Sequence, residues 1–344
     1  MRYLFFTRSQ IKMIYPTVTG VDIGHHSIKA ASIRLKKGQF ELIACHEVLL
    51  PDSVFIDTNS VNLEELTPYL TRLKKMLSFN QKRIAFSVPD SNIISKVIQI
   101  DSQLDEKETE FAIAHTFNQQ SSFSVEDLNL DYVALNQRGV SSVKTTTYQV
   151  FATRKDLIES RQLCFSSGGL TPVLADAHSH SLFALWKKAT ESYPNKKNWM
   201  LIDIGHAQTI FCVMSPNHNF YSKNIMFGAQ DLQSKDEQET SESISFEHDT
   251  KFIAQLSEHI KRQVTLYSSI HHHKIEGLWV VGGGALLPGL SDCLSYEVSL
   301  PTMELNVSSL FFQDKKRVMP MAVNASQYAV ALGLALRGVS WLTR

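Results

Sequence analysis

Residues 20–33 read GVDIGHHSIKAASI, and this stretch decides the architecture of the chain. A short apolar run leads to Asp22, and Gly24 permits a tight turn before a second run in which apolar and polar residues alternate. The stretch therefore predicts two strands joined by a short loop with a carboxylate at its start. Taken alone, the same pattern is also typical of an ordinary turn.

A second copy of the pattern lies about half a chain later, where residues 199–214 read WMLIDIGHAQTIFCVM. Asp203 and Gly205 correspond to Asp22 and Gly24, and both loops continue with a histidine. An internal repeat at this distance predicts two similar lobes, each with the same strand–turn–strand loop. The repeated loop is a far more specific signal than either copy by itself.

A third loop, GGG at residues 282–284, follows an apolar run. Backbone N–H groups bind phosphate well, and glycine lets the backbone approach a ligand closely. Two facing carboxylates can hold a hydrated Mg²⁺, because this ion keeps its waters and takes few protein ligands. Two acidic loops and one glycine loop therefore predict a nucleotide cleft between the lobes, with Asp22 and Asp203 nearest to the metal.

The remaining pattern is that of an α/β protein with an inserted module. Caps mark two helices, since Asn62 precedes an amphipathic stretch and Asp105 is followed by Glu108 three residues later. We expect a strand–helix–strand–strand–helix order across the inserted module. The acidic segment 232–250 predicts a loop. Further strands are expected at 18–23, 27–35, 40–50 and 83–88, and further helices at 155–167, 251–274, beyond Pro288 and at 328–336.

Composition excludes several classes of protein. Lys+Arg and Asp+Glu both number 34, which argues against a general nucleic-acid binder. No apolar run reaches the roughly 18 residues that a membrane span needs, so we expect a cytoplasmic protein. The four cysteines lack C-x-x-C spacing and are expected to be buried free thiols. Consecutive histidines at 271–273 point in different directions on a helix and do not predict a metal site.

The ordered set of two acidic loops and one glycine loop resembles the actin, sugar kinase and Hsp70 superfamily. More narrowly, the chain resembles the PilM family of type IV pilus assembly, which is related to the division protein FtsA. The resemblance implies an α/β, actin-like (ribonuclease H-like) two-lobed ATPase fold with an FtsA-type inserted subdomain in lobe one. The segments that carry it are GVDIGHHSIKAASI, RIAFSVPDSNIISKVIQI, LIDIGHAQTIFCVM, VVGGGALLPGL and YAVALGLALRGV.

The resemblance also implies a division of the chain into successive segments. We expect a flexible N-terminal tail at 1–16, the first part of lobe I at 17–89, the inserted α/β subdomain at 90–171, the second part of lobe I at 172–202, lobe II at 203–321, and a C-terminal helix returning to lobe I at 322–344.

ATP and Mg²⁺ are the cofactors that the resemblance implies, with Asp22 and Asp203 holding the metal through water. The remaining nucleotide-binding candidates are Gly24, His25, His26, Ser27 and Lys29 in the first phosphate loop, Gly205 and Thr209 in the second, and Gly282, Gly283 and Gly284 in the adenosine loop. The histidines either donate to phosphate or pack outward from their loops.

Departures from the family pattern bear on hydrolysis. Histidines stand where small residues are usual, at His25, His26 and His206, and His178 stands where the family tends to have a glutamate. These differences favour ATP binding with at most weak ATPase activity.

The function implied is that of a scaffold recruited to the inner-membrane face. It would bind the N-terminal cytoplasmic peptide of PilN, an inner-membrane protein that acts with PilO and PilP, and pilus motor components are further candidate partners. One alternative is a nucleotide-hydrolysing enzyme of the actin/Hsp70 fold. The other is an FtsA-like, filament-forming, membrane-associated protein. The ending of the chain directly after a core helix counts against this last alternative.

Overall fold

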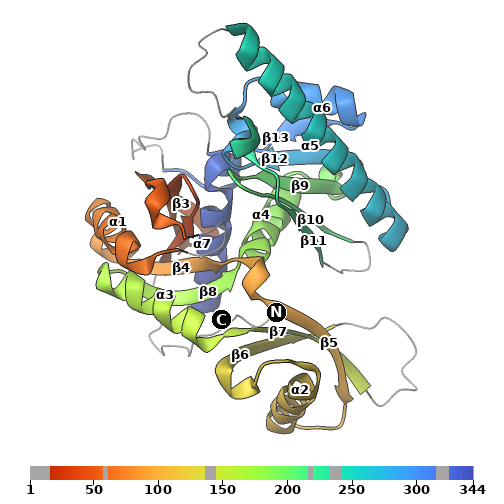
Figure 1. Cartoon of the computed structure of the whole chain (residues 1–344). Coiled ribbons are helices and arrows are strands. Elements are labelled where there is room, and N and C mark those ends of the chain that lie inside the picture. Colours follow the sequence, from red (N-terminus) through yellow and green to blue (C-terminus); the bar gives the residue numbers. More distant parts are fainter. Residues whose placement is uncertain are drawn as a thin grey trace.

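Two five-stranded sheets form the centre of the molecule, one in each lobe (Figure 1). The computed structural model describes residues 16–56, 61–135, 145–215, 220–232, 242–314 and 325–343. The lobe I sheet has the order β3-β2-β1-β4-β8 and consists of β1 (Thr17–Ile23), β2 (Ser27–Lys36), β3 (Gln39–Leu49), β4 (Arg83–Val88) and β8 (Thr171–Ala177). The lobe II sheet has the order β11-β10-β9-β12-β13 and consists of β9 (Trp199–Ile204), β10 (Thr209–Met214), β11 (Phe220–Ile225), β12 (Gly277–Val281) and β13 (Thr302–Glu304).

The two sheets share one topology, which confirms the internal repeat. In each sheet the first three strands in sequence are antiparallel neighbours and the last two join in parallel. The repeated loops are also closed in the same way. Gly24 N donates to Ser27 O at 3.1 Å, and Gly205 N donates to Gln208 O at 2.9 Å. Each loop thus holds its aspartate at the end of the first strand of its sheet.

Helices cover the outer face of each sheet and fill the space between the lobes. The outer helices are α1 (Leu63–Met76) and α3 (Lys155–Ser167) in lobe I, and α5 (Glu242–His271) and α6 (Leu290–Val298) in lobe II. Between the lobes, α4 (His178–Ser192) packs against α7 (Ala329–Leu342). A Cβ on Gly20 of β1 would overlap Ala331 O of α7, so this glycine serves close packing. The buried side chains around α4 and α7 join both lobes in one core.

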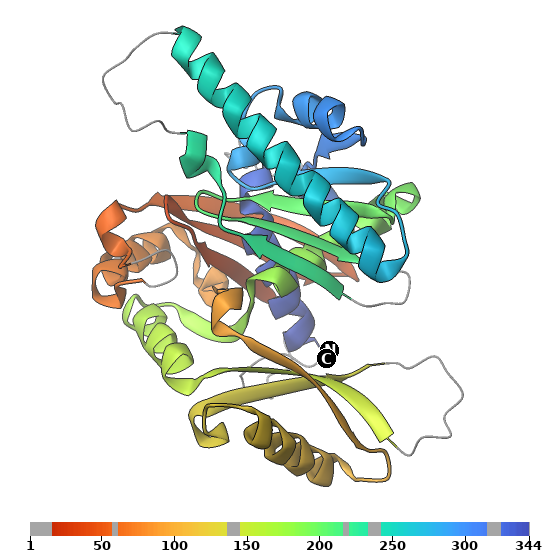
Figure 2. The ribbon, with the colours of Figure 1, turned by 45° about the vertical axis from the view of Figure 1, so that its right-hand side comes forward.

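The insert forms a smaller body beside lobe I (Figures 1 and 2). Its antiparallel sheet has the order β5-β7-β6, and α2 covers one face of it. Its own core contains Ile98, Ile113, Phe117 and Val150. Although α3 lies within the expected range 90–171, its buried side chains belong to the core of lobe I. The elements of the insert are β5 (Ile94–Asp101), α2 (Glu106–Gln120), β6 (Leu128–Ala134) and β7 (Thr145–Arg154).

The two predicted helix caps are confirmed. Asn62 Oδ1 accepts from Glu64 N and Glu65 N, at 3.1 and 3.3 Å, and Asp105 forms a capping box with Glu108. Residues 233–241 of the loop expected over 232–250 lie outside the described residues, and the expectation is wrong for 242–250, because α5 already begins at Glu242. Glutamate has good helix propensity, so an acidic composition does not by itself stop a helix.

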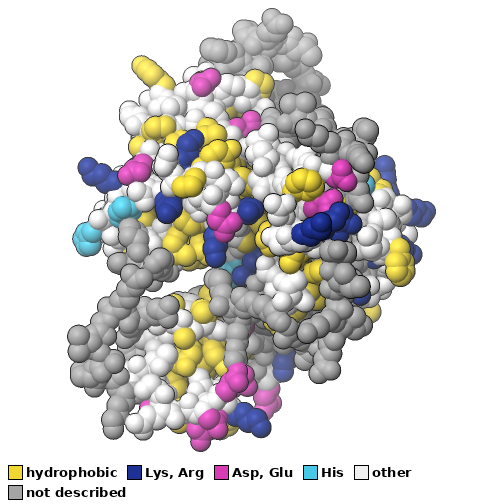
Figure 3. Space-filling model, turned by 180° about the vertical axis from the view of Figure 1, so that it is seen from behind, with side chains coloured by type: hydrophobic (Ala, Val, Ile, Leu, Met, Phe, Trp, Pro, Cys, Tyr) yellow, Lys and Arg dark blue, Asp and Glu magenta, His cyan; other side chains and the backbone are white. Residues whose placement is uncertain are grey.

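The described surface shows charges of both signs interspersed, as Figure 3 illustrates for the rear face. Within the residues that the structure describes, no helix has both the length and the apolar character needed to cross a membrane. All four thiols are free. Cys164 and Cys212 are buried as expected, whereas Cys45 is only partly buried and Cys293 on α6 is exposed. Nearly all of the expected N-terminal tail, residues 1–15, lies outside the described residues.

Candidate functional site

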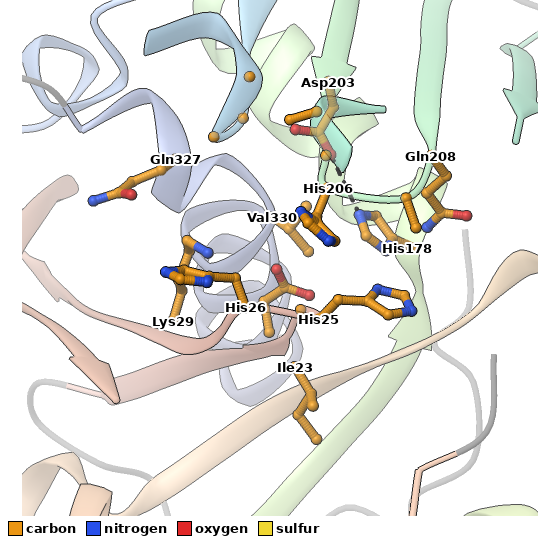
Figure 4. A pocket seen from close by; sticks show the side chains of 18 of the residues that line it. Ile23, His25, His26, Lys29, His178, Asp203, His206, Gln208, Gln327 and Val330 are labelled. Carbon is orange, nitrogen blue, oxygen red and sulfur yellow. Dashed lines mark ion pairs between the residues drawn. The ribbon is translucent and has the colours of Figure 1, made fainter. Parts of the chain in front are cut away.

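A cavity of about 480 Å³ lies between the two lobes, where the repeated loops face each other. Figure 4 shows His25, His26 and Lys29 of lobe I opposite Asp203 and other side chains of lobe II. The predicted site residues that line this cavity are Asp22, Gly24, His25, His26, Lys29, Asp203, Gly205, Gly282, Gly283 and Gly284. Segments far apart in the sequence are thus brought together as the internal repeat leads one to expect.

Two predicted residues, Ser27 and Thr209, are fully buried and do not line the cavity. Ser27 Oγ donates to Glu47 Oε1 at 2.6 Å, and Thr209 Oγ1 donates to Phe227 O at 2.8 Å. The loop hydrogen bonds make Gln208, rather than Thr209, the counterpart of Ser27, and Gln208 does reach the cavity. Successive side chains along a strand point to opposite faces. Thr209 follows Gln208 by one residue, so its side chain points away from the cavity.

The two aspartates share the cavity with His178, the first residue of α4. His178 Nε2 lies 3.5 Å from Asp203 Oδ2, an ion-pair distance marked in Figure 4. Burial would lower the pKa of His178, but the carboxylates of Asp203, Asp22 and Asp90 outweigh it and raise the pKa to about 9. Burial raises the pKa of Asp22 above its ordinary value, despite the opposing charges of His178 and Lys29. An imidazolium therefore neutralises part of the acidic charge between the lobes.

Two glycines of the glycine loop, Gly282 and Gly283, differ in whether the structure requires a glycine at their position. Gly282 has a φ of 91°, and a Cβ there would come within 2.5 Å of Ile204 O and closer still to Asp203 Oδ1. Gly283 has ordinary helical angles, φ −65° and ψ −37°, and a Cβ there would meet nothing within 4 Å. The backbone requires glycine at position 282 but not at position 283. A side chain at position 283 would therefore occupy free space at the cavity wall.

The histidines of the loops line the cavity instead of pointing away from it. The His25 ring stacks on Phe55, with centroids 4.4 Å apart and planes at 18°, and its centroid lies 6.2 Å from that of His206. Lys29 Nζ donates to Ser27 Oγ at 2.8 Å. Imidazole N–H groups and one ammonium thus approach the same space from both lobes, which suits an anionic ligand.

Several cavity residues carry no signal in the sequence. Arg161 of α3 reaches the cavity wall, and its Nη1 donates to Ser87 O at 3.4 Å. Ser87 Oγ in turn donates to Asp22 Oδ1 at 3.4 Å. Because these side chains come from elements distant in the sequence, only the folded chain brings them together.

The donor set around Asp22 and Asp203 bears on the expected metal. Among the described residues, no group of three or more His, Cys, Asp or Glu side chains is arranged to hold a metal ion. Two carboxylates facing one cavity do fit a hydrated Mg²⁺, which takes few direct protein ligands. Such an ion would compete with His178 for the carboxylate of Asp203.

The sequence of the chain matches the family model of the type IV pilus assembly protein PilM over residues 20–236 and 232–339. The chain belongs to the PilM family. A solved PilM-PilN type IV pilus biogenesis complex is similar to it with a TM-score of 0.73 at 20% identity, covering 94% of this chain and 98% of that chain. The ethanolamine utilization protein EutJ from Carboxydothermus hydrogenoformans is similar with a TM-score of 0.51 at 12% identity, covering 96% and 92%. These similarities confirm the actin-like, two-lobed fold of this PilM-family chain.

Proposed function

We propose that this PilM-family chain is an ATP-binding scaffold of type IV pilus assembly. The observation that carries the proposal is the meeting of both repeated loops and the glycine loop at a single cavity. Gly283 has no side chain and has open space beside it, which leaves room for a base or ribose against the backbone.

In this proposal the nucleotide lies with its phosphates between the repeated loops. His25, Lys29 and His206 would donate to phosphate oxygens, and Asp22 and Asp203 would hold Mg²⁺ through its waters. The ion supplies positive charge beside the phosphates. The pKa of His178 is raised to about 9, so its ring is protonated at neutral pH and cannot accept a proton from an attacking water molecule, and we expect at most weak hydrolysis.

Joint replacement of the aspartates tests the cleft. For the variant carrying Asp22→Asn and Asp203→Asn, we expect Mg-ATP to bind about tenfold more weakly, a loss of about 1.4 kcal/mol, because neither amide attracts the ion as a carboxylate does. Isothermal titration calorimetry measures the change, and Asp292→Asn on the exposed part of α6 serves as the control. An unchanged affinity in the double variant would contradict the assignment of the cleft.

The partner proposed is the N-terminal cytoplasmic peptide of a PilN-type inner-membrane protein. The similar solved structure is a complex of PilM with PilN, which supports a partner of this class. We place the peptide in the region between the insert and lobe I, bound by strand addition or in apolar pockets. Through this peptide the chain would be recruited from the cytoplasm to the inner-membrane face, where PilO and PilP are further candidates for the same assembly.

Direct binding tests the partner. A labelled peptide from the N-terminus of the PilN-type protein encoded with this chain should give saturable fluorescence anisotropy with the full chain. A scrambled peptide of the same composition should not. β5 is an edge strand of the insert sheet, and a peptide could pair with its free edge. Val97→Pro places a residue without a backbone N–H in this exposed part of β5. If the peptide adds as a strand there, binding should weaken about tenfold. Equal binding of authentic and scrambled peptides would contradict the proposed partner.

A further inference from the structure

The insert is connected to the wall of the cavity directly at its leading end and through α3 at its trailing end. On the leading side, Pro89 lines the cavity and the insert begins directly after it. On the trailing side, Arg161 of α3 lines the cavity and donates to Ser87 O at 3.4 Å. The two ends are also tied together, because Thr153 Oγ1 donates to Asn92 O at 2.8 Å. A ligand in the cavity therefore lies next to the point where the chain enters the insert, and next to the helix α3 into which the insert leads.

The first turn of α4 is bound to the start of the insert by an unusual cap. Ala177, the N-cap residue of α4, provides no side-chain cap. Asp90, which is distant in the sequence, caps the helix instead. Ser179 N donates to Asp90 Oδ2 at 3.1 Å, and Ser179 Oγ donates to Asp90 Oδ1 at 2.6 Å. A carboxylate is favoured at a helix N-terminus, where backbone N–H groups lack partners within the helix. The start of the insert is thus held by the helix.

The residues on either side of Ser179 contact the cleft and the body of the insert. His178 pairs with Asp203 in the cavity, as described above. The ring of His180 meets Phe151 of β7 edge-on, with centroids 4.9 Å apart, and lies 6.1 Å from the ring of Phe220 in lobe II. Three consecutive residues of one helical turn therefore connect the cleft, the start of the insert and a strand of the insert.

This turn has little room to absorb a displacement. A Cβ on Gly333 of α7 would overlap Ser181 O, so the backbones of the two helices are in contact at this point. His180 Nδ1 lies 3.1 Å from Asp176 Oδ1, and Ser179 and His180 are both buried. Tightly packed elements shift between discrete arrangements more readily than they deform continuously.

We propose that occupancy of the cavity and the position of the insert are coupled through the first turn of α4, with the Ser179–Asp90 pair as the joint. The inference rests on the proposed function, because the ligand is a nucleotide. A nucleotide with its hydrated ion competes with His178 for the carboxylate of Asp203, and the turn passes the change to Asp90. If the nucleotide changes the affinity of the insert for a peptide, then by thermodynamic linkage the peptide changes the affinity for the nucleotide by the same factor.

Hydrogen exchange on the full chain tests the coupling. Saturating Mg-ATP should change the exchange rates of β5 and β7 amides in the wild type by at least about fivefold. In Ser179→Ala, one of the two bonds to Asp90 is lost and the response of the insert should fall below about twofold. Mg-ATP affinity, measured by calorimetry, should stay within about threefold of the wild type, since Ser179 does not line the cavity.

A matched control lies on the same helix. Ser192→Ala removes a serine hydroxyl that donates to Lys188 O at 3.3 Å, far from the joint, and should keep the full response of the insert. If Ser179→Ala does not fold, Asp90→Asn replaces it, because an amide retains only one of the two accepting oxygens; its response should be at most half that of the wild type.

The outcomes separate the two proposals. Absence of Mg-ATP binding in the wild type overturns the proposed function and this inference with it. Binding without a change in insert exchange overturns the coupling alone, as does a full response in Ser179→Ala or Asp90→Asn. A response present in the wild type and in Ser192→Ala, but reduced in the variants of the joint, supports the coupling.

Discussion

Replacement of Asp176 by alanine should lower the free energy of unfolding by about 3–5 kcal/mol, because it breaks a buried ion pair and leaves charge without its partner. Asp176 is fully buried in β8 and accepts from the Arg337 guanidinium of α7, while its other oxygen lies 3.1 Å from His180 Nδ1. It thereby joins the lobe I sheet to both helices between the lobes. Urea denaturation followed by circular dichroism measures the loss.

The pH dependence of this loss has a definite sign. Burial would raise the pKa of Asp176, but Arg337 and His180 outweigh it and hold the pKa at about 2, below the unfolded value. A depressed pKa contributes stability above the unfolded pKa, and this contribution disappears as the pH falls from about 4 to about 2. The difference between wild type and Asp176→Ala should shrink over that window. Asp127→Ala, at an exposed position, should cost less than about 0.5 kcal/mol, and a cost below about 1 kcal/mol in Asp176→Ala would contradict the role of the pair.

Replacement of Gly283 by leucine should weaken ATP binding about hundredfold, equivalent to about 2.7 kcal/mol, while the fold remains intact. The backbone at this position has ordinary helical angles, so leucine introduces no strain. Gly283 lines the cavity and a Cβ there would meet nothing within 4 Å, so we expect the longer leucine side chain to take up space that the ligand needs. Calorimetry measures affinity and thermal unfolding measures stability. Because a loss of affinity without a loss of stability is expected, blocking of the site can be separated from misfolding.

Gly283→Ala is the matched control for this variant. Its single methyl group would meet nothing within 4 Å, and its affinity should stay within about threefold of the wild type. Undiminished ATP binding in Gly283→Leu would mean that the base and ribose do not lie against this loop.

Local patterns made most of the lobes predictable from the sequence. Alternation and apolar runs located the strands, and Asn62 and Asp105 located two helix starts, because these signals act between residues close in the sequence. The repeat carried the inference further. Since Asp22 and Asp203 hold equivalent positions in two lobes of one topology, their meeting at one cavity followed from the sequence.

The first turn of α4 could not be predicted in this way. Its cap comes from Asp90, and His178 meets Asp203, so both contacts join residues that are separated in the sequence. Thr209 illustrates a second limit. A hydroxyl next to a repeated loop looks suitable for phosphate, but the pleat of β10 turns it toward Phe227 O. Register within a strand depends on pairing, which a single segment does not encode.

The position of the insert within the shared topology indicates how the two lobes are related. Two adjacent parallel strands require a crossover, and in lobe II the crossover between β12 and β13 contains α6 as its single α-helix. In lobe I the equivalent crossover runs from β4 to β8, and α3 is its returning helix, packed in the lobe I core as a crossover helix should be. The insert is therefore an extension of one crossover in a unit that occurs twice in the chain, and it precedes the crossover helix α3. This position accounts for the insert leaving lobe I beside the cleft, since the crossover leaves the sheet at the strand ends where ligands of α/β proteins bind.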